Sequence, residues 1–140
     1  MADTKKSSFG LKNDPPFIQA AYGLCLSLQQ LTAGFPRKHK FTLGDRIALD
    51  GINLVEMVVH ANGQSNLQER VKMLAPIPVA LLAIRLKLRL AMDLVCLGAG
   101  AFTDLSISID DVARQSKDLL RWAEDAIEGA SAGGGVSRRF

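Results

Sequence analysis

The chain has 140 residues, of which 48% are hydrophobic and 22% are charged. This composition excludes a disordered chain, and the length suits one folded domain, because single domains most often have about 100–150 residues. The formal net charge of +3 permits a polyanionic partner without requiring one.

The chain shows no pattern for export or membrane insertion. Residues 1–11 lack the apolar core of a signal peptide. The longest uncharged stretch, residues 15–36, is interrupted by glutamine, serine and threonine, which excludes a membrane span. Cys25 and Cys96 are too few for a disulfide framework and lie in apolar stretches. We therefore expect a cytoplasmic protein with two reduced, buried thiols.

The first predicted helix follows a polar, lysine-bearing segment, residues 1–13, which we expect to be disordered. Asp14 offers an N-cap, with Pro15 at the first helical position. Gly34 and Pro36 end this helix. Between these limits, apolar residues recur at spacings of three and four and form one face of the helix. The stripe consists of Phe17, Ala21, Leu24, Leu28, Leu31 and Phe35.

A short basic loop, residues 37–40, separates the first helix from the second. Thr42 and Asp45 fit a capping box, in which the threonine oxygen accepts a backbone N–H at the helix start. Gly44 and Gly51 are seven residues apart and weaken the helix, which indicates a close approach by a neighbouring helix. The stripe of this helix ends near residue 61 and consists of Leu43, Ile47, Leu54, Val58 and Ala61.

The turn between the second and third predicted helices has a helix-stop signal before it and a helix-capping signal after it. Asn62 and Gly63 form a helix stop. Ser65 or Asn66 caps the next helix, and Glu69 follows three residues after Asn66, as in a capping box.

Two prolines, Pro76 and Pro78, interrupt the third apolar stripe. A proline removes a backbone hydrogen bond and clashes with the preceding turn. The sequence leaves two alternatives open: one kinked helix, or two helices over residues 66–75 and 78–97. The stripe consists of Leu67, Val71, Leu74, Leu81, Ile84, Leu88 and Ala91, and reaches Leu97.

The fourth predicted helix covers about residues 101–127, and the small-residue segment 128–140 is expected to be a flexible tail. Its stripe consists of Phe102, Leu105, Ile109, Val112, Leu119, Ala123 and Ala126, with Ser116 as a polar exception. No strand pattern competes with these helices. Short connections between amphipathic helices predict an all-α fold, an up-down-up-down four-helix bundle over residues 14–127.

The sequence lacks patterns for catalysis or metal binding. His39 lies in the basic loop, and His60 follows Glu56 without the Glu-x-x-His motifs of di-iron bundles. No Cys-x-x-Cys pair, glycine-rich phosphate loop or Gly-x-Ser-x-Gly sequence occurs. The carboxylates of the fourth helix alternate with lysine and arginine, as on a solvated helix face. We therefore expect no enzymatic activity, no metal and no cofactor.

The positive charge is concentrated in two clusters. The junction cluster follows the first predicted helix and consists of Arg37, Lys38, Lys40 and Arg46. The mid-chain cluster lies in the third helical segment and consists of Arg85, Lys87 and Arg89. Arg85 and Arg89 share a helix face and repel each other by a few tenths of a kcal/mol. Asp93 could offset that repulsion from within the helix, or a phosphate backbone could do so from outside.

Two blocks of sequence resemble a family of small bacterial four-helix bundles. The first block contains Phe35-Pro36-Arg37, Phe41-Thr42-Leu43-Gly44 and Arg46-Ile47. The second contains Arg89-Leu90-Ala91, Asp93-Leu94, Leu97 and Phe102, and Trp122 fits a late aromatic position. Over about residues 17–126 the chain resembles the accessory variability determinant proteins of diversity-generating retroelements. The same group includes the bundles encoded in intervening sequences of large-subunit ribosomal RNA genes.

The resemblance implies a homopentameric barrel of four-helix bundles without catalytic activity. It also implies binding of the element's reverse transcriptase and template RNA through a basic surface, in support of mutagenic reverse transcription. By position, it assigns Arg37 and Arg46 to the first block and Arg89 to the second; Lys38, Lys40, Arg85 and Lys87 are added from the charge pattern. The low net charge favours an alternative, a helical protein–protein adaptor of the intervening-sequence type that does not bind nucleic acid.

Overall fold

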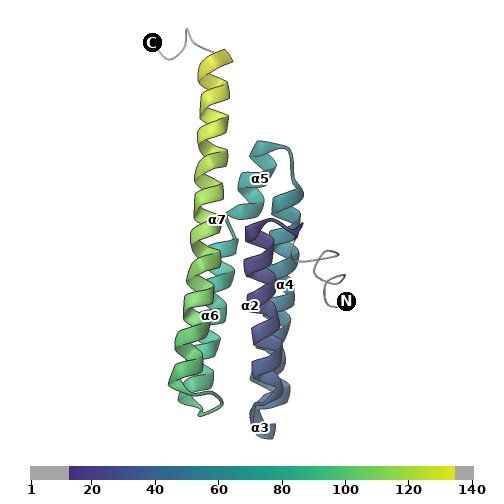
Figure 1. The fold of residues 1–140 in the computed structure, drawn as a ribbon, viewed down its shortest axis with the longest axis vertical. Helices are drawn as coiled ribbons and strands as arrows, with labels where there is room; N and C mark the ends of the chain where they lie inside the picture. The colour runs from purple at the N-terminus through teal and green to yellow at the C-terminus, as the bar shows by residue number, and fades with distance from the viewer. Residues whose placement is uncertain (1–12, 135–140) are drawn as a thin grey trace.

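A computed structural model describes residues 13–134, and every regular element in this part of the chain is helical (Figure 1). The elements are α2 (Pro16–Ala33), α3 (Arg37–His39), the π-helix η2 (Lys40–Gly44), α4 (Asp45–Gly63), α5 (Leu67–Leu74), α6 (Ile77–Asp93) and α7 (Ala99–Gly134). The all-α prediction is therefore confirmed.

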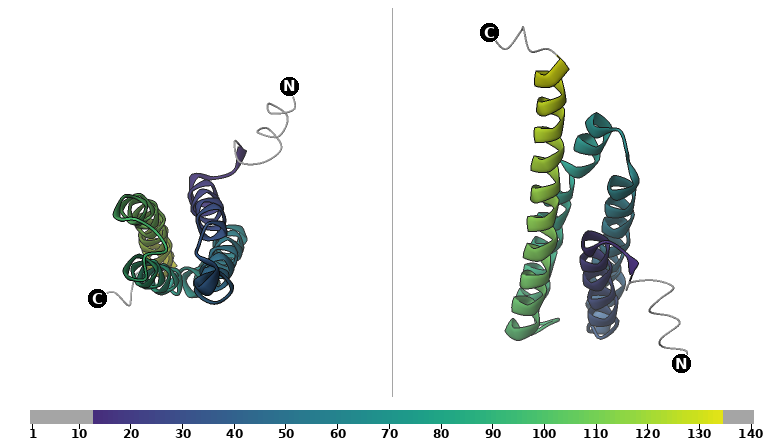
Figure 2. Two further views of the ribbon diagram at one scale, coloured as in Figure 1. Left: turned by 90° about the horizontal axis from the view of Figure 1, so that it is seen from below. Right: turned by 45° about the horizontal axis from the view of Figure 1, so that its top comes forward.

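The four long helices alternate in direction and form a bundle. α2 packs against α4 and α7, and α6 also packs against α4 and α7, so that the helices enclose a common core. Figures 1 and 2 show that α3 and the α6–α7 connection lie at one end of this bundle, which we call the α3 end. α5 lies at the opposite end, and α7 continues past it (Figure 1).

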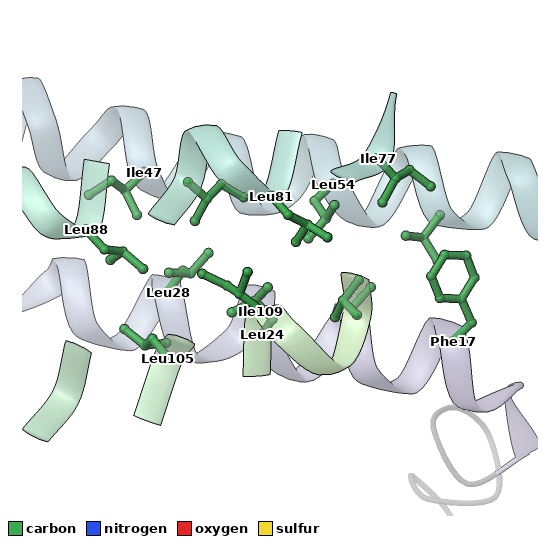
Figure 3. Packing of buried hydrophobic residues seen from close by; sticks show 14 of the residues in the cluster. Phe17, Leu24, Leu28, Ile47, Leu54, Ile77, Leu81, Leu88, Leu105 and Ile109 are labelled. Atoms are coloured by element: carbon green, nitrogen blue, oxygen red, sulfur yellow. The ribbon is translucent and has the colours of Figure 1, made fainter. Parts of the chain in front are cut away.

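The core consists mainly of the predicted apolar stripes, together with Ile77, which is fully buried and which no predicted stripe includes. Stripe members from all four long helices contact one another in this core (Figure 3). Most are fully buried, and the half-buried members at the margin are Leu31, Leu43, Leu67, Val71, Phe102, Leu119 and Ala126. Ser116 is buried among them and donates its hydroxyl to the carbonyl oxygen of Ala113 at 2.9 Å, which satisfies the polar group.

Gly51 lies at a close approach of α2 to α4, as predicted. A Cβ atom at this position would be 3.2 Å from Leu28 Cδ1 and 3.5 Å from the Cα of Cys25. Gln29, from the same face of α2, donates its side-chain amide to the carbonyl oxygen of Ala48 at 2.8 Å. Cys25 and Cys96 are both free, but they are half-buried and not fully buried as predicted.

The structure corrects two predicted caps. α2 begins at Pro16, and Asp14 provides no side-chain cap; its carbonyl oxygen instead accepts the Gln19 side-chain amide at 2.6 Å. The Thr42–Asp45 capping box is also wrong, because α3, η2 and α4 follow one another without a break. The start of α4 at Asp45 therefore has no side-chain cap. The Thr42 hydroxyl instead donates to the carbonyl oxygen of His39 at 3.4 Å.

The region around the two prolines forms two helices, which decides between the predicted alternatives. The Asn66 side chain caps α5 by accepting the backbone N–H of Glu69 at 3.0 Å, as predicted. α5 ends at Leu74, and α6 begins at Ile77, with Pro78 in its first turn. α6 ends at Asp93 and not at residue 97.

The last helix is longer than predicted. α7 begins at Ala99 and continues through Gly134, so residues 128–134 are helical and not a flexible tail. Residues 1–12 and 135–140, which carry the rest of the two predicted tails, lie outside the described part of the chain. None of the described helices is both long and apolar enough to cross a membrane.

Val95, which lies two residues after the end of α6, has an unusual backbone conformation. Its φ of 62° lies in the left-handed region, which a β-branched residue rarely adopts. The N–H groups of Val95 and Cys96 bond to the carbonyl oxygens of Met92 and Ala91 at 2.9 and 2.8 Å. This is the hydrogen-bond pattern of a Schellman cap, in which glycine normally holds the position of Val95.

The Val95→Gly variant is expected to be more stable than the parent by about 1 kcal/mol, because glycine removes the left-handed strain and the valine side chain buries little surface. Val79→Gly is the control, because Val79 is also exposed but lies in the first turns of α6. This control is expected to lose about 0.5 kcal/mol. Urea unfolding followed by circular dichroism measures the free energy of unfolding of both variants. A loss of stability in Val95→Gly would contradict the inference that the backbone is strained at Val95.

Candidate nucleic-acid interface

The junction cluster lies together at the α3 end of the bundle. Arg37 and Lys38 belong to α3, Lys40 to η2 and Arg46 to the first turn of α4. The predicted loop is thus helical, and its four cations are fixed to consecutive turns. A π-helix such as η2 is rare and is frequent at functional sites.

The charges of the junction cluster are not neutralised by the described residues. None of the four side chains forms an ion pair within residues 13–134. Arg37, Lys38 and Arg46 are exposed, and Lys40 is half-buried. The ammonium of Lys40 lies 5.8 Å from the ring centroid of Phe41, whose side chain is 65% exposed. This end of the bundle therefore presents a concentrated positive charge next to one aromatic ring.

The mid-chain cluster is neutralised, and its three side chains turn in different directions. Arg85 pairs with Asp110 of α7. Lys87 Nζ lies 2.7 Å from Asp50 Oδ2 of α4. Arg89 Nε lies 3.7 Å from Asp93 Oδ2, one turn further along α6. The structure therefore shows the first of the two alternatives, a partner for Arg89 within its own helix, although this pair is exposed and such pairs contribute little stability.

One side chain from each cluster contributes to the same surface groove. The groove has a volume of about 540 Å³ and lies between α4 and α6 at the α3 end. Its lining consists of His39, Thr42, Leu43, Arg46, Lys87, Leu90 and Leu94. Neither the position of His39 in the basic loop nor the third apolar stripe predicts these groove residues. The signal for Leu90 and Leu94 is a second apolar series on α6, in which Val79, Leu82, Leu86, Leu90 and Leu94 recur at spacings of three and four.

The described residues include no cluster of metal ligands. No three His, Cys, Asp or Glu side chains among residues 13–134 lie close enough to hold a metal ion. His60 and Glu56 are both exposed on α4. On α7, Arg114 pairs with Asp111.

Comparison of the chain with protein-family models, with curated proteins and with solved structures finds no match. The geometry itself shows four cations at one end of a helical bundle that have no ion-pair partner among residues 13–134. Such an arrangement attracts polyanions without regard to their sequence.

Proposed function

We propose that the protein is a non-catalytic, cytoplasmic accessory subunit of a diversity-generating retroelement. It binds the element's reverse transcriptase and its template RNA or DNA through basic surfaces and thereby supports mutagenic reverse transcription. The observation that carries this proposal is the junction cluster. Its four cations are unpaired within the described residues, and two of them, Arg37 and Arg46, belong to the sequence block that resembles this family.

The contacts we propose are with the phosphate backbone. Arg37, Lys38, Lys40 and Arg46 supply charge, and Phe41 is the only Phe, Tyr or Trp among residues 37–46. Recognition by base stacking requires a series of aromatic platforms, which this end does not offer. Arg85, Lys87 and Arg89 contribute less in this proposal, because a phosphate would have to displace the carboxylate that already pairs with each of them.

We also propose that the subunit assembles into a homopentamer. A second apolar series lies on the outer face of α6, and its members are Val79, Leu82, Leu86, Leu90 and Leu94. Val79, Leu82 and Leu86 lie outside the groove, and we assign these three to contacts with another copy, because a monomeric protein rarely exposes a continuous apolar surface. Five copies of a chain with a net charge of +3 carry five times that charge, or +15.

A second candidate function is a helical protein–protein adaptor that does not bind nucleic acid. The neutralised mid-chain cluster and the outer apolar series of α6 favour it. Retention of RNA at about 50 mM salt, where such binding is strongest, distinguishes the two functions. An adaptor retains none.

The proposed function is tested by DNA synthesis in vitro with the retroelement's reverse transcriptase and template RNA. Replacing Arg37, Lys38, Lys40 and Arg46 by glutamate is expected to abolish synthesis, because the surface then repels phosphate. Light scattering checks that the variant keeps the parent's assembly.

The matched control replaces four exposed cations elsewhere by glutamate, namely Lys72, Arg114, Lys117 and Arg121. Its net charge changes by the same amount, so a specific role for the junction cluster predicts that the control retains most of its synthesis. Undiminished synthesis by the junction variant would refute the surface assignment.

A further inference from the structure

The groove at the α3 end is lined by both leucine and cationic side chains. Leu43 lines it from the α4 side, and Leu90 and Leu94 line it from α6. Leu90 is 48% exposed, so its side chain has apolar surface left to bury. Arg46 lies in the lining and has no ion-pair partner among residues 13–134.

A second hollow lies farther along the seam between the two helices. It has a volume of about 220 Å³ and shares Lys87 with the groove. Its one carboxylate, Asp50, is neutralised by its ion pair with Lys87. Of the cations that line the two hollows, Arg46 is the one without an ion-pair partner among residues 13–134, and it lies at the α3 end.

Two unusual backbone features flank the groove. η2 supplies Thr42 and Leu43 on one side, and Val95, in its left-handed conformation, directly follows Leu94 on the other. Val95 is 82% exposed, so burial of its side chain does not compensate for the backbone strain. Strain of this kind persists mainly at functional sites, so it supports a binding role for this end.

The leucines decide which class of partner fits. A phosphate backbone seated between Leu43, Leu90 and Leu94 would lose hydration without gaining hydrogen bonds from those walls. An amphipathic protein segment buries its apolar side chains there and keeps its carboxylates near Arg46 and the rest of the junction cluster. Apolar complementarity and charge complementarity therefore both favour a protein segment over nucleic acid.

We propose that this groove docks an acidic, leucine-bearing segment of a partner protein. Its apolar side chains contact Leu43, Leu90 and Leu94, and its carboxylates pair with Arg46 and the neighbouring cations. The inference deepens the proposed function by separating a protein-docking groove from the outward cations that contact nucleic acid. It rests on that function only in placing the partner protein in the same complex.

The test is a peptide-display selection against the full chain, followed by fluorescence anisotropy of a selected, labelled peptide. We expect enriched peptides to combine aspartate or glutamate with leucine, isoleucine or phenylalanine at spacings of three and four. The Leu90→Ser variant is expected to bind the selected peptide at least about fivefold more weakly, as for a partly buried anchor residue. Arg46→Gln is expected to weaken binding and to reduce its salt dependence.

Leu86→Ser is the matched control, because Leu86 belongs to the same outer series of α6 but does not line the groove. Equal losses in Leu86→Ser and Leu90→Ser would assign the effect to assembly and overturn the proposal. It would also be overturned by a selection without acidic, apolar peptides, or by an unchanged affinity in Leu90→Ser.

A second measurement uses a labelled single-stranded RNA of about 20 nucleotides with the same variants. We expect Leu90→Ser to leave RNA affinity unchanged; a loss equal to that for the peptide would make the groove a nucleic-acid site and refute this inference. If the parent binds the peptide but no RNA, the proposed function fails and the groove assignment stands. The two failures are therefore distinguishable.

Discussion

Replacing Arg37, Lys38, Lys40 and Arg46 by glutamine is expected to lower the affinity for single-stranded RNA by about a hundredfold or more at 50 mM salt. Each cation that contacts a phosphate releases a counterion, so log affinity falls by about 0.7 per contact for each tenfold rise in salt. Loss of four contacts should therefore reduce the magnitude of the salt slope by about three. Anisotropy titrations of labelled RNA at several salt concentrations measure both quantities.

The control for this experiment is the triple variant in which Arg85, Lys87 and Arg89 become glutamine. Each of these cations already pairs with a carboxylate, so their loss should change RNA affinity by less than about threefold. Equal losses of affinity in the two variants would show that the ion pairs of α6 open on binding. That result would extend the interface to α6 and contradict the ranking of the clusters proposed above.

The Leu88→Ala variant is expected to lose about 2–5 kcal/mol of unfolding free energy. Leu88 is fully buried in the core, where a smaller side chain leaves a cavity (Figure 3). Leu86 is only two residues away on α6, but it is 61% exposed. In the isolated subunit, Leu86→Ala should change the unfolding free energy by less than about 0.5 kcal/mol.

Urea unfolding followed by circular dichroism measures both variants. It requires a protein concentration low enough for the subunit to be monomeric, because assembly adds stability that depends on concentration. Similar losses at the two positions would contradict the orientation of α6 described here.

The core could be predicted from the sequence because burial in a helix repeats every three or four residues. Leu24, Leu54, Ile84 and Ile109 each lie on such a stripe, and each is buried. The caps were less predictable. The Thr42 cap fails because residues 40–44 adopt a π-helix, and local sequence does not encode that choice.

Among the ion pairs of the mid-chain cluster, only the one within a single helix could be predicted from the sequence. The partner of Arg89 is Asp93, four residues away on the same helix, and the sequence identified it. Arg85 pairs with a residue 25 positions away and Lys87 with one 37 positions away. Those two partners depend on how the helices are rotated against each other, which no single helix pattern specifies. The groove combines residues 39–46 with residues 87–94 and was missed for the same reason.

The unbroken helical path from Arg37 through η2 to Gly63 bears on how fast a partner binds. A basic loop would have to become ordered on each encounter, and that loss of conformational entropy would weaken the complex. Here the cations are already held on helical turns, so little ordering remains to be done. Association is then governed by electrostatic steering, and its rate constant should fall with ionic strength. The α3 end is therefore a preorganised binding surface, and it differs in this respect from a flexible basic segment that becomes ordered on binding.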